Sequence, residues 1–235
     1  MSLRFRRALL KLSGEVLGGK EGPLDRGAFS FYAEEIGRAR EAGAELGVVV
    51  GGGNVARGAA LTFISPTAGH TAGMLGTLIN AVVLREFLQN LGIPTLLMSA
   101  LPVEGLAEPV NPWRAREALA QGAVVLFAAG TGNPFVTTDT AAVIRALSIE
   151  AEAVLKASKV PGIFEDDPLK NPKARLIPRL SHAEYLARGL RVMDAAAVAI
   201  AQENRLPILV FQADQEGAIL EALEGKRGSI IGGEG

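Results

Sequence analysis

The segment that most constrains the fold is residues 48–58, which read Val-Val-Val-Gly-Gly-Gly-Asn-Val-Ala-Arg-Gly. Its uncharged β-branched run is typical of a strand buried inside a parallel sheet, and the three glycines let the backbone turn and approach a ligand closely. Just beyond the glycines, Asn54 and Arg57 supply an amide and a fixed cation, which suits an anion such as phosphate. The spacing matches neither the Rossmann fingerprint nor the P-loop, and an ordinary tight strand-to-helix connection is an equal alternative.

Length and composition exclude several classes of protein. A chain of 235 residues suffices for one large α/β domain or two small ones. Because 24 basic and 25 acidic residues give a net charge of −1, a general affinity for nucleic acid or anionic membranes is not expected. The absence of cysteine excludes disulfides and zinc–thiolate sites, and two histidines make a multi-histidine metal site implausible. We find neither a signal-peptide pattern nor a stretch approaching the length of a membrane span, so we expect a cytoplasmic protein.

Expected strands and helices alternate along the chain. Apolar runs predict strands at residues 8–12, 46–50, 95–99, 123–127, 153–156, 208–211 and 229–231, the last of them an edge strand. Apolar periodicity and capping residues predict helices at 26–42, 71–91, 111–122, 181–188, 194–204 and 216–224, and another that begins near residue 138. This order predicts an α/β fold, a three-layer αβα sandwich around a mostly parallel doubly wound sheet, with residues 1–235 as a single domain and ligands at the carboxyl ends of the strands.

The predicted helix at 71–91 carries apolar residues around most of its circumference rather than along one stripe. A helix of this kind is buried on more than one side. In a chain of this size, the pattern suggests a contact with another subunit in addition to the core.

Three further strand ends carry residues suited to phosphate. Lys11 precedes Ser13 and Gly14, whose backbone donors can hold phosphate oxygens, although Lys11 alone would be taken for a lysine on a solvent face. Residues 128–139 combine glycines, an amide, three threonines and one carboxylate where a helix begins, which suits a ligand with both phosphate and hydrogen-bonding edges. Lys156 ends another strand. Two lysines and glycine turns at one sheet edge meet the needs of phosphoryl transfer, namely positioning and cations on the transferred group.

Six segments together resemble one family. They are Lys-Leu-Ser-Gly-Glu at 11–15, Val-Val-Gly-Gly-Gly-Asn at 49–54 with Arg57, Gly-Thr-Gly-Asn-Pro-Phe at 130–135, Thr-Thr-Asp at 137–139, Val-Leu-Lys-Ala-Ser-Lys-Val at 154–160 and Val-Met-Asp at 192–194. They occur in the right order across essentially the whole chain. On these segments the chain resembles the bacterial UMP kinases of the amino acid kinase family, and the Gly-Thr-Gly-Asn-Pro loop favours that branch over the amino acid and carbamate kinases.

The resemblance implies an amino acid kinase-like fold and transfer of the γ-phosphoryl group of ATP to UMP, giving UDP and ADP in pyrimidine nucleotide (CTP and UTP) biosynthesis. It also implies Mg²⁺ bridged by the ATP phosphates, with no protein ligand assigned to the metal. It further implies a homohexamer, and in some members of the family GTP activates and UTP inhibits. No residue need act as a strong base, because a loose transition state makes proton removal from a phosphate nucleophile nearly irrelevant.

The resemblance also implies roles for residues at matching positions. Lys11 and Lys156 would neutralise the transferred group, Asp194 would orient the lysines, and Asp139 would help order the UMP loop. The residues contacting ATP would be Lys11, Leu12, Ser13, Gly14, Gly53 and Arg57 at its phosphates and Ser158, Phe164 and Asp167 at its nucleoside. The residues contacting UMP would be Gly52, His70, Thr131, Gly132, Asn133, Pro134, Phe135, Val136, Thr137 and Thr138.

His70 marks a departure from the family pattern. Where the family usually has an aspartate that bonds the UMP ribose, this chain reads His-Thr-Ala-Gly-Met at 70–74. A neutral imidazole can bond one ribose hydroxyl but cannot accept from two. A helix-start histidine that faces solvent is an alternative reading. Trp113, Arg114 and Arg116 lie where the effector site is expected, but such residues at a helix start are more often ordinary surface packing.

Two other functions stay open. A nucleotide-binding protein on the same fold can have lost catalysis and act in regulation or storage. Another amino acid kinase would act on a carboxylate or carbamate. The presence of Lys11, Lys156, Asp139 and Asp194 together favours an enzyme, because a binding protein has no need of the lysine pair that meets the γ-phosphoryl group.

Overall fold

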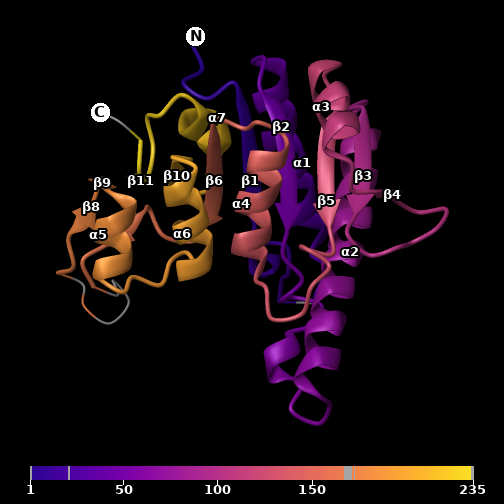
Figure 1. The fold of residues 1–235 in the computed structure, drawn as a ribbon. Coiled ribbons are helices and arrows are strands. Elements are labelled where there is room, and N and C mark those ends of the chain that lie inside the picture. The colour runs from indigo at the N-terminus through magenta and orange to yellow at the C-terminus, as the bar shows by residue number, and fades with distance from the viewer. Residues whose placement is uncertain (1, 21, 167–170, 172, 234–235) are drawn as a thin grey trace.

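The computed structural model describes residues 2–20, 22–166, 171 and 173–233, and a nine-stranded sheet runs through the molecule (Figure 1). The strand order is β4-β3-β5-β2-β1-β6-β10-β11-β9, and each described pairing is parallel except that of β10 with β11. A separate antiparallel ribbon pairs β7 (Ile163–Phe164) with β8 (Leu176–Ile177). The strands of the main sheet are β1 (Arg7–Leu12), β2 (Glu45–Val50), β3 (Thr95–Ser99), β4 (Glu108–Pro109), β5 (Val124–Ala128), β6 (Ala153–Ser158), β9 (Arg179–Leu180), β10 (Ile208–Gln212) and β11 (Ser229–Ile231).

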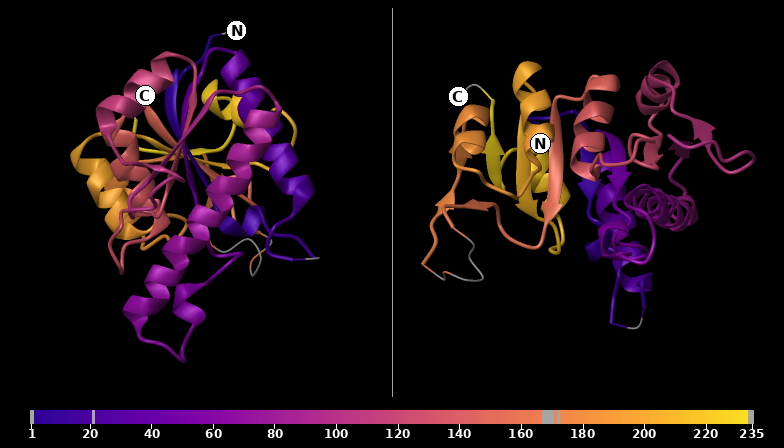
Figure 2. Two further views of the ribbon diagram at one scale, coloured as in Figure 1. Left: turned by 90° about the vertical axis from the view of Figure 1, so that its right-hand side faces the viewer. Right: turned by 60° about the horizontal axis from the view of Figure 1, so that its bottom comes forward.

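Helices cover both faces of the sheet (Figure 2). One face is covered by α1 (Arg26–Glu41), α2 (Pro66–Asn90) and α7 (Ala218–Leu223). The other face is covered by α3 (Pro112–Ala120), α4 (Thr138–Ser148), α5 (His182–Ala187) and α6 (Ala195–Glu203). Two short 3₁₀ turns, η1 (Gly14–Val16) and η2 (Gly58–Ala60), follow the glycine-bearing ends of β1 and β2.

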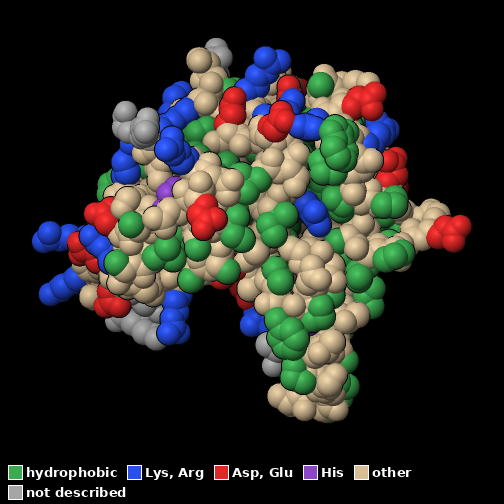
Figure 3. Space-filling model, viewed as in Figure 1, with side chains coloured by type: hydrophobic (Ala, Val, Ile, Leu, Met, Phe, Trp, Pro, Cys, Tyr) green, Lys and Arg blue, Asp and Glu red, His purple; other side chains and the backbone are tan. Residues whose placement is uncertain are grey.

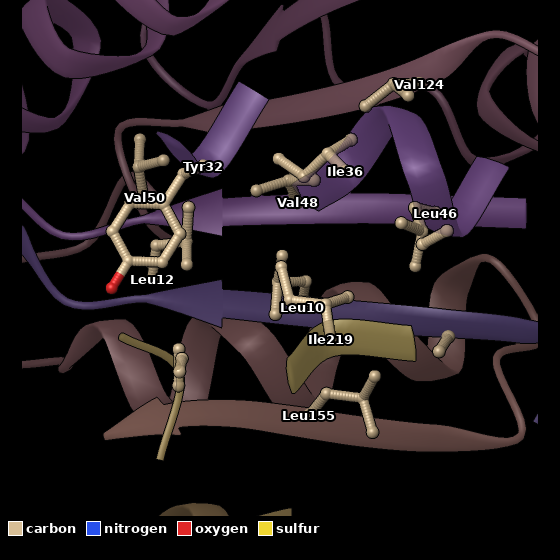
Figure 4. Close-up of a cluster of buried hydrophobic side chains, with 14 of the residues drawn as sticks. Leu10, Leu12, Tyr32, Ile36, Leu46, Val48, Val50, Val124, Leu155 and Ile219 are labelled. Carbon is tan, nitrogen blue, oxygen red and sulfur yellow. The ribbon is translucent and has the colours of Figure 1, made fainter. Parts of the chain in front are cut away.

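The alternation of side chains along each strand builds the two cores. Leu9 of β1 packs into the cluster under α3 to α6, whereas Leu10 and Leu12 pack into the cluster under α1, α2 and α7. Figure 4 shows Leu10 and Leu12 in the cluster under α1, α2 and α7, together with Tyr32 and Ile36 of α1. Both faces of the central strands are therefore buried, which explains their continuous apolar runs and confirms the predicted αβα sandwich around a mostly parallel sheet.

The prediction for the longest helix was wrong at its start and about its length. We expected a helix at 71–91, but α2 begins at Pro66, with the Ser65 hydroxyl accepting a hydrogen bond from Ala68 N at 3.3 Å. We also expected no stretch approaching a membrane span, yet this helix of 25 residues contains an 18-residue window with a mean hydropathy of 1.3, and it is long and apolar enough to cross a membrane by length and composition alone. Within that window 44% is buried inside the protein, so the helix is only partly a core helix.

Two strand predictions also need correction. Residues 229–231 do not form the edge of the sheet, because β9 pairs in parallel with β11 on its outer side. Lys156 does not end its strand, because β6 continues to Ser158 through its pairing with β10. Neither extension has an apolar run long enough to be recognised in the sequence.

The amino-terminal half of α2 projects beyond the sheet (Figure 1) and carries apolar side chains on its surface (Figure 3). Phe63, just before the helix, is 83% exposed, and Leu75 and Ile79 within the helix are 47% and 44% exposed. The predicted contact with another subunit stays a prediction, and these residues are where it would form.

Candidate active site

The strand ends that carry most of the predicted site residues meet at one edge of the sheet. β5, β2, β1 and β6 are consecutive neighbours, and their pairings are parallel, so their carboxyl ends lie together. Lys11 of β1 is directly opposite Lys156 of β6 in register. The glycine turn after β2 and the loop after β5 lie on one side of Lys11, and Lys156 lies on the other.

Asp139 bridges the two lysines. Its Oδ1 lies 3.0 Å from Lys11 Nζ, and its Oδ2 accepts a hydrogen bond from Lys156 Nζ at 2.8 Å. The exposed fractions of the Asp139, Lys11 and Lys156 side chains are only 13%, 9% and 11%. One carboxylate thus holds two ammonium groups close together in a largely dry setting, where their charges are poorly screened.

The pKa values in this bridge follow from burial and from the neighbouring charges. Burial raises the pKa of Asp139, but the two ammonium groups together outweigh it and hold that pKa below its usual value. Burial lowers the pKa of Lys156, and the positive charge of Lys11 lowers it further, while Asp139 acts in the opposite direction. Asp139 therefore stays ionised at neutral pH and supports the charge of Lys156.

Residues 192–194 contact this bridge from the start of α6. Lys156 Nζ donates to Val192 O, and Asp194 N donates to Asp139 Oδ2 at 3.3 Å. The Asp194 carboxylate accepts from the hydroxyls of Thr137 and Thr140. It also caps α6 by accepting from the backbone at 2.7 Å.

The contacts of Asp139 and Asp194 differ from our expectation. We expected Asp194 to orient the lysines and Asp139 to help order the UMP loop. In the structure, Asp139 contacts both lysines, because α4 packs directly over β1 and β6 and brings its first turn to them. Asp194 instead contacts Thr137 and Thr140, where that loop ends and α4 begins.

The glycine turn after β2 packs tightly against α2. A Cβ on Gly52 would lie 2.5 Å from Gly73 O and 2.7 Å from Thr77 N, so no side chain fits there. At Gly53 the nearest atoms to an added Cβ belong to the Arg57 side chain, at 3.7 Å and beyond. This segment therefore combines the two predicted roles. Gly52 permits a tight strand-to-helix connection, and Gly53 leaves backbone accessible to a ligand.

Two asparagines hold this turn from inside. Asn80 of α2 is fully buried and donates to Gly51 O and to Asn54 Oδ1, both at 2.7 Å. The Asn54 amide in turn donates to Asn80 Oδ1 at 3.0 Å and to Pro23 O at 2.6 Å. Asn54 was expected to offer its amide to an anion, but that amide is used within the protein.

Arg57 extends from the same turn into solvent. Its side chain is 60% exposed and pairs with Glu15, which is 52% exposed. Exposed ion pairs of this kind contribute little to stability. The guanidinium is therefore available to exchange Glu15 for a phosphate.

Buried side chains hold the loop after β5 in an unusual conformation. Ala129 and Phe135 have positive φ angles of 60° and 66°, which side-chain-bearing residues rarely adopt. Thr77 of α2 accepts a hydrogen bond from Ala129 N at 2.7 Å, and the buried Arg145 of α4 donates to Gly130 O at 2.9 Å. The loop is thus fixed at its first residues by two helices on opposite faces of the sheet.

A cleft of about 510 Å³ opens beside this loop. His70 borders the cleft from α2, and its ring centroid lies 4.7 Å from that of Phe135 in the loop, so the histidine does not simply face solvent. The lining includes Gly52, Gly53, Arg57, His70, Thr77, Gly130, Val136, Thr137 and Thr138.

The other residues predicted to contact UMP lie along the loop, outside the cleft lining. Thr131 borders a larger cavity of about 1100 Å³ beside β3 and β4, and its hydroxyl accepts from Asn133 N at 3.3 Å. Gly132 packs against Ala100, where an added Cβ would lie 3.0 Å from the carbonyl oxygen. Pro134 is half-buried.

The residues predicted to contact ATP fall into two groups. Leu12, Ser13 and Gly14 follow Lys11 directly, and the Ser13 hydroxyl accepts from Lys11 Nζ at 3.0 Å. Gly53 and Arg57 lie in the adjacent turn after β2, so this phosphate group is brought together. The nucleoside group is more dispersed: Ser158 ends β6, Phe164 lies in β7, and Asp167 lies outside the described residues.

A divalent metal would have to rely on its nucleotide for ligands. Within residues 2–166, 171 and 173–233, apart from residue 21, no group of three or more His, Asp or Glu residues could hold a metal ion. Both oxygens of Asp139 engage ammonium groups, and those of Asp194 engage hydroxyl and amide protons. Mg²⁺ commonly binds through substrate phosphates, and this donor set fits that arrangement.

Four residues that shape the site were not predicted. Thr77 and Asn80 are polar residues within a predicted apolar helix, and that mismatch was a usable signal. Arg145 and Tyr185 carried no local signal, because their partners at Gly130 and at residue 193 are distant or unremarkable in sequence.

This fold and this site define the class to which the protein belongs. The model of the amino acid kinase family matches residues 6–212, and the chain belongs to that family. Within it, the chain is similar to the uridylate kinase of Brucella anthropi, at 44% identity over 225 residues that cover 94% of each protein. It is also 44% identical over 236 residues to the chloroplastic uridylate kinase of Arabidopsis thaliana, covering 98% of this chain and 70% of that protein. The crystal structure of UMP kinase from Bacillus anthracis matches with a TM-score of 0.94 and 33% identity, covering 98% of this chain and 97% of that one.

Proposed function

We propose that this protein is a UMP kinase, which transfers the γ-phosphoryl group of ATP to UMP and releases UDP and ADP in pyrimidine nucleotide biosynthesis. The observation that carries the proposal is the Lys11–Asp139–Lys156 bridge, at the sheet edge that also carries two phosphate-suited turns and a cleft. The relatives named uridylate kinase support UMP as the acceptor. We propose that residues 1–235 act as one amino acid kinase-like domain in the cytoplasm.

The chemistry requires cations more than it requires a base. An oxygen of the UMP phosphate attacks the γ-phosphorus of ATP, and the bond from that phosphorus to the bridging oxygen breaks, which leaves ADP. Negative charge on the transferred group and on ADP is stabilised by Lys11 and Lys156. Asp139 holds both ammonium groups in place before the reaction, so little reorganisation is needed when the charge develops.

The donor nucleotide binds along the turns after β1 and β2. Backbone N–H groups there and the Arg57 guanidinium hold its phosphates. Mg²⁺ would be held through the nucleotide phosphates rather than by protein side chains, and it would supply additional charge neutralisation there. The phosphate contacts are Lys11, Leu12, Ser13, Gly14, Gly53 and Arg57, and the nucleoside contacts among the described residues are Ser158 and Phe164.

The acceptor binds in the cleft at the start of α4. Gly52 and the first turn of α4 at Thr138 receive the UMP phosphate, because a helix N-terminus offers free backbone donors to an anion. Residues 131–137 enclose the rest of the nucleotide. His70, which contacts the Phe135 ring, bonds one ribose hydroxyl in place of the usual aspartate.

A coupled assay of ADP release with ATP and Mg²⁺ tests the proposal, with UMP, CMP, AMP and GMP offered in turn. A rate with UMP well above the others is the expected result. No rate with any of them, while calorimetry shows ATP or UMP binding, would refute the proposal and favour a catalytically silent nucleotide-binding protein. Activity on an acidic metabolite alone would favour another kinase of the family.

We also propose a homohexamer that responds to GTP and UTP. The exposed apolar residues at the projecting end of α2 support association, because surfaces of this kind seldom stay open to water. The cavity of about 1100 Å³ adjoins the start of α3, where Trp113 is 73% exposed near Arg114 and Arg116, and it is the candidate effector site. Light scattering measures the mass of the particle, and rates with added GTP or UTP measure the response.

A further inference from the structure

The connection between α5 and α6 ends against the lysine–aspartate bridge. Val192 O accepts from Lys156 Nζ, and Asp194 N donates to Asp139 Oδ2 at 3.3 Å. The residue between these two contacts is Met193, which is fully buried. Any displacement of Met193 therefore moves two backbone groups that contact the bridge.

Tyr185 of α5 bonds Met193 at both of its backbone polar groups. The Tyr185 hydroxyl accepts from Met193 N at 2.6 Å and donates to Met193 O at 2.9 Å. Tyr185 is itself fully buried, and burial raises the pKa of its hydroxyl to about 12, so the hydroxyl keeps the proton that it donates. The phenol thus satisfies both groups in a segment that belongs to neither a strand nor a helix.

The position of Tyr185 is set by other contacts of α5. The helix begins with a capping box in which Ser181 N donates to Glu184 Oε2 at 2.7 Å and Glu184 N donates to Ser181 Oγ at 3.1 Å. Nε2 of the buried His182 lies 2.9 Å from Leu206 O. α5 also packs against α6. Tyr185 therefore connects a fixed helix to residues 192–194.

We propose that Tyr185 is a positioning residue for phosphoryl transfer, which acts through Met193 to keep the Val192 carbonyl on Lys156 and the Asp194 amide on Asp139. It touches neither the substrates nor the reacting atoms. The charged groups around Lys156 are Lys11 of β1, Asp139 of α4 and Asp194 at the start of α6, and a change at Tyr185 alters none of them. The kinetic part of this inference rests on the proposed kinase function, and the structural part does not.

The first test separates turnover from substrate binding. Tyr185→Phe keeps the ring and removes only the oxygen that bonds Met193. We expect kcat with ATP and UMP to fall about tenfold and both KM values to stay within about twofold, because a misplaced cation is felt mainly in the transition state. A fall in kcat of less than about twofold would overturn the proposal.

Two control variants distinguish positioning from loss of structure. Ser181→Ala weakens the start of the same helix, while the His182 contact and the packing of α5 on α6 still hold the phenol in place. Tyr32→Phe removes the hydroxyl of the other buried tyrosine, which lies on α1 at the opposite face of the sheet. Both controls should keep kcat within about twofold of the unmodified protein. A loss in Ser181→Ala equal to that in Tyr185→Phe would overturn the proposal.

A second measurement does not depend on turnover. A limiting amount of an amine-acylating reagent labels Lys156 and Lys226, and peptide mass spectrometry gives the ratio of the two. Lys226 is the internal reference, because it pairs with Glu224 and lies outside the bridge. We expect the ratio to rise at least about threefold in Tyr185→Phe and to keep its original value in both controls.

The kinetic measurement and the labelling measurement test different parts of the inference, so each can fail without the other. An unchanged labelling ratio in Tyr185→Phe would overturn the positioning role whatever the activity. A raised ratio in a protein that phosphorylates nothing would support the positioning role and refute the kinase function. If Tyr185→Phe does not fold, fluorotyrosine incorporated into Tyr32→Phe, where Tyr185 is the one tyrosine left, takes its place, because fluorine withdraws electron density and weakens the hydrogen bond that the hydroxyl accepts from Met193 N.

Discussion

Replacing Asp139 by Asn tests the central contact of the site. The change keeps the size of the side chain but removes the charge that compensates Lys11 and Lys156, whose Nζ atoms lie 3.0 and 2.8 Å from the carboxylate oxygens. With an effective dielectric constant of about 20, each pair gains about 6 kcal/mol of attraction, much of it offset by the cost of burying the charges. Breaking such a buried cluster at one partner costs about 3–5 kcal/mol. We expect Asp139→Asn to lower the free energy of unfolding by about that amount at neutral pH.

The pH dependence separates this effect of charge from an effect of packing. In the unmodified protein the pKa of Asp139 is held below its usual value, so its stabilisation is complete above that usual value and is lost as the pH falls through the lowered pKa. In Asp139→Asn, Lys156 loses the carboxylate that supports its charge, so its pKa in the folded protein falls further. The folded variant then binds fewer protons than the unfolded chain, and its stability rises towards alkaline pH relative to the unmodified protein.

Urea denaturation at about pH 7 and about pH 9.5 measures both effects. Asp25→Asn is the control, because Asp25 caps α1 by accepting from Ala28 N at 2.8 Å and asparagine caps a helix equally well. A loss of less than about 1 kcal/mol in Asp139→Asn, or the same loss at both pH values, would refute the reasoning that the carboxylate compensates two buried cations.

Three other substitutions test further contacts. Lys156→Ala should lower kcat about a hundredfold or more, because the charge of Lys156 is needed mainly in the transition state. It should weaken UMP binding, measured by calorimetry, by less than about threefold, and equal losses in kcat and in binding would contradict this role. Asn80→Ala should lower the free energy of unfolding, measured by urea denaturation, by about 2–3 kcal/mol, because it leaves a buried carbonyl of the glycine turn unpaired. The control Asn90→Ala, at the exposed end of α2, should change that free energy by less than about 0.5 kcal/mol. Glu35→Ala should lower the free energy of unfolding by about 2 kcal/mol and lower the melting temperature, because the buried Glu35 carboxylate accepts hydrogen bonds from backbone amides at the start of α7. A similar loss in Glu34→Ala, at an exposed position, would contradict that explanation.

The strand ends that form the site could be predicted because their signals are local. The apolar runs at 48–50 and 123–127 and the glycines after them stand in consecutive residues, and parallel strands bring their carboxyl ends to one edge. The large apolar residues of α2 begin only at Met74, so apolar periodicity alone places the start of this helix too late. Ser65 and Pro66 already formed a capping residue and a first-turn proline, which are start signals in their own right.

The contacts that hold the site together could not be predicted, because they join residues far apart in the sequence. The family resemblance supplied both Asp139 and Asp194, but which of them meets the lysines depends on how α4 packs over β1 and β6. Likewise, Thr77 bonds the first residue of the loop after β5, and no pattern within either segment indicates the other. Contacts of this kind are set by the tertiary packing of the helices.

The central place of β1 in the sheet has a consequence for how this scaffold can be altered. β1 carries Lys11 and lies in the middle of the sheet. On its cleft side lie β2 and then β5, and on its other side lie β6 and then β10. The loop after β5 as far as Val136, with the α2 residue Thr77 that supports it, can therefore be exchanged as one cassette if Thr137, Asp139 and Arg145 are kept. Grafting such a cassette from a relative with another acceptor would redesign selectivity while inheriting the phosphate-donor machinery intact, and successive exchanges of this sort are a route by which one ancestral scaffold diversifies its substrates.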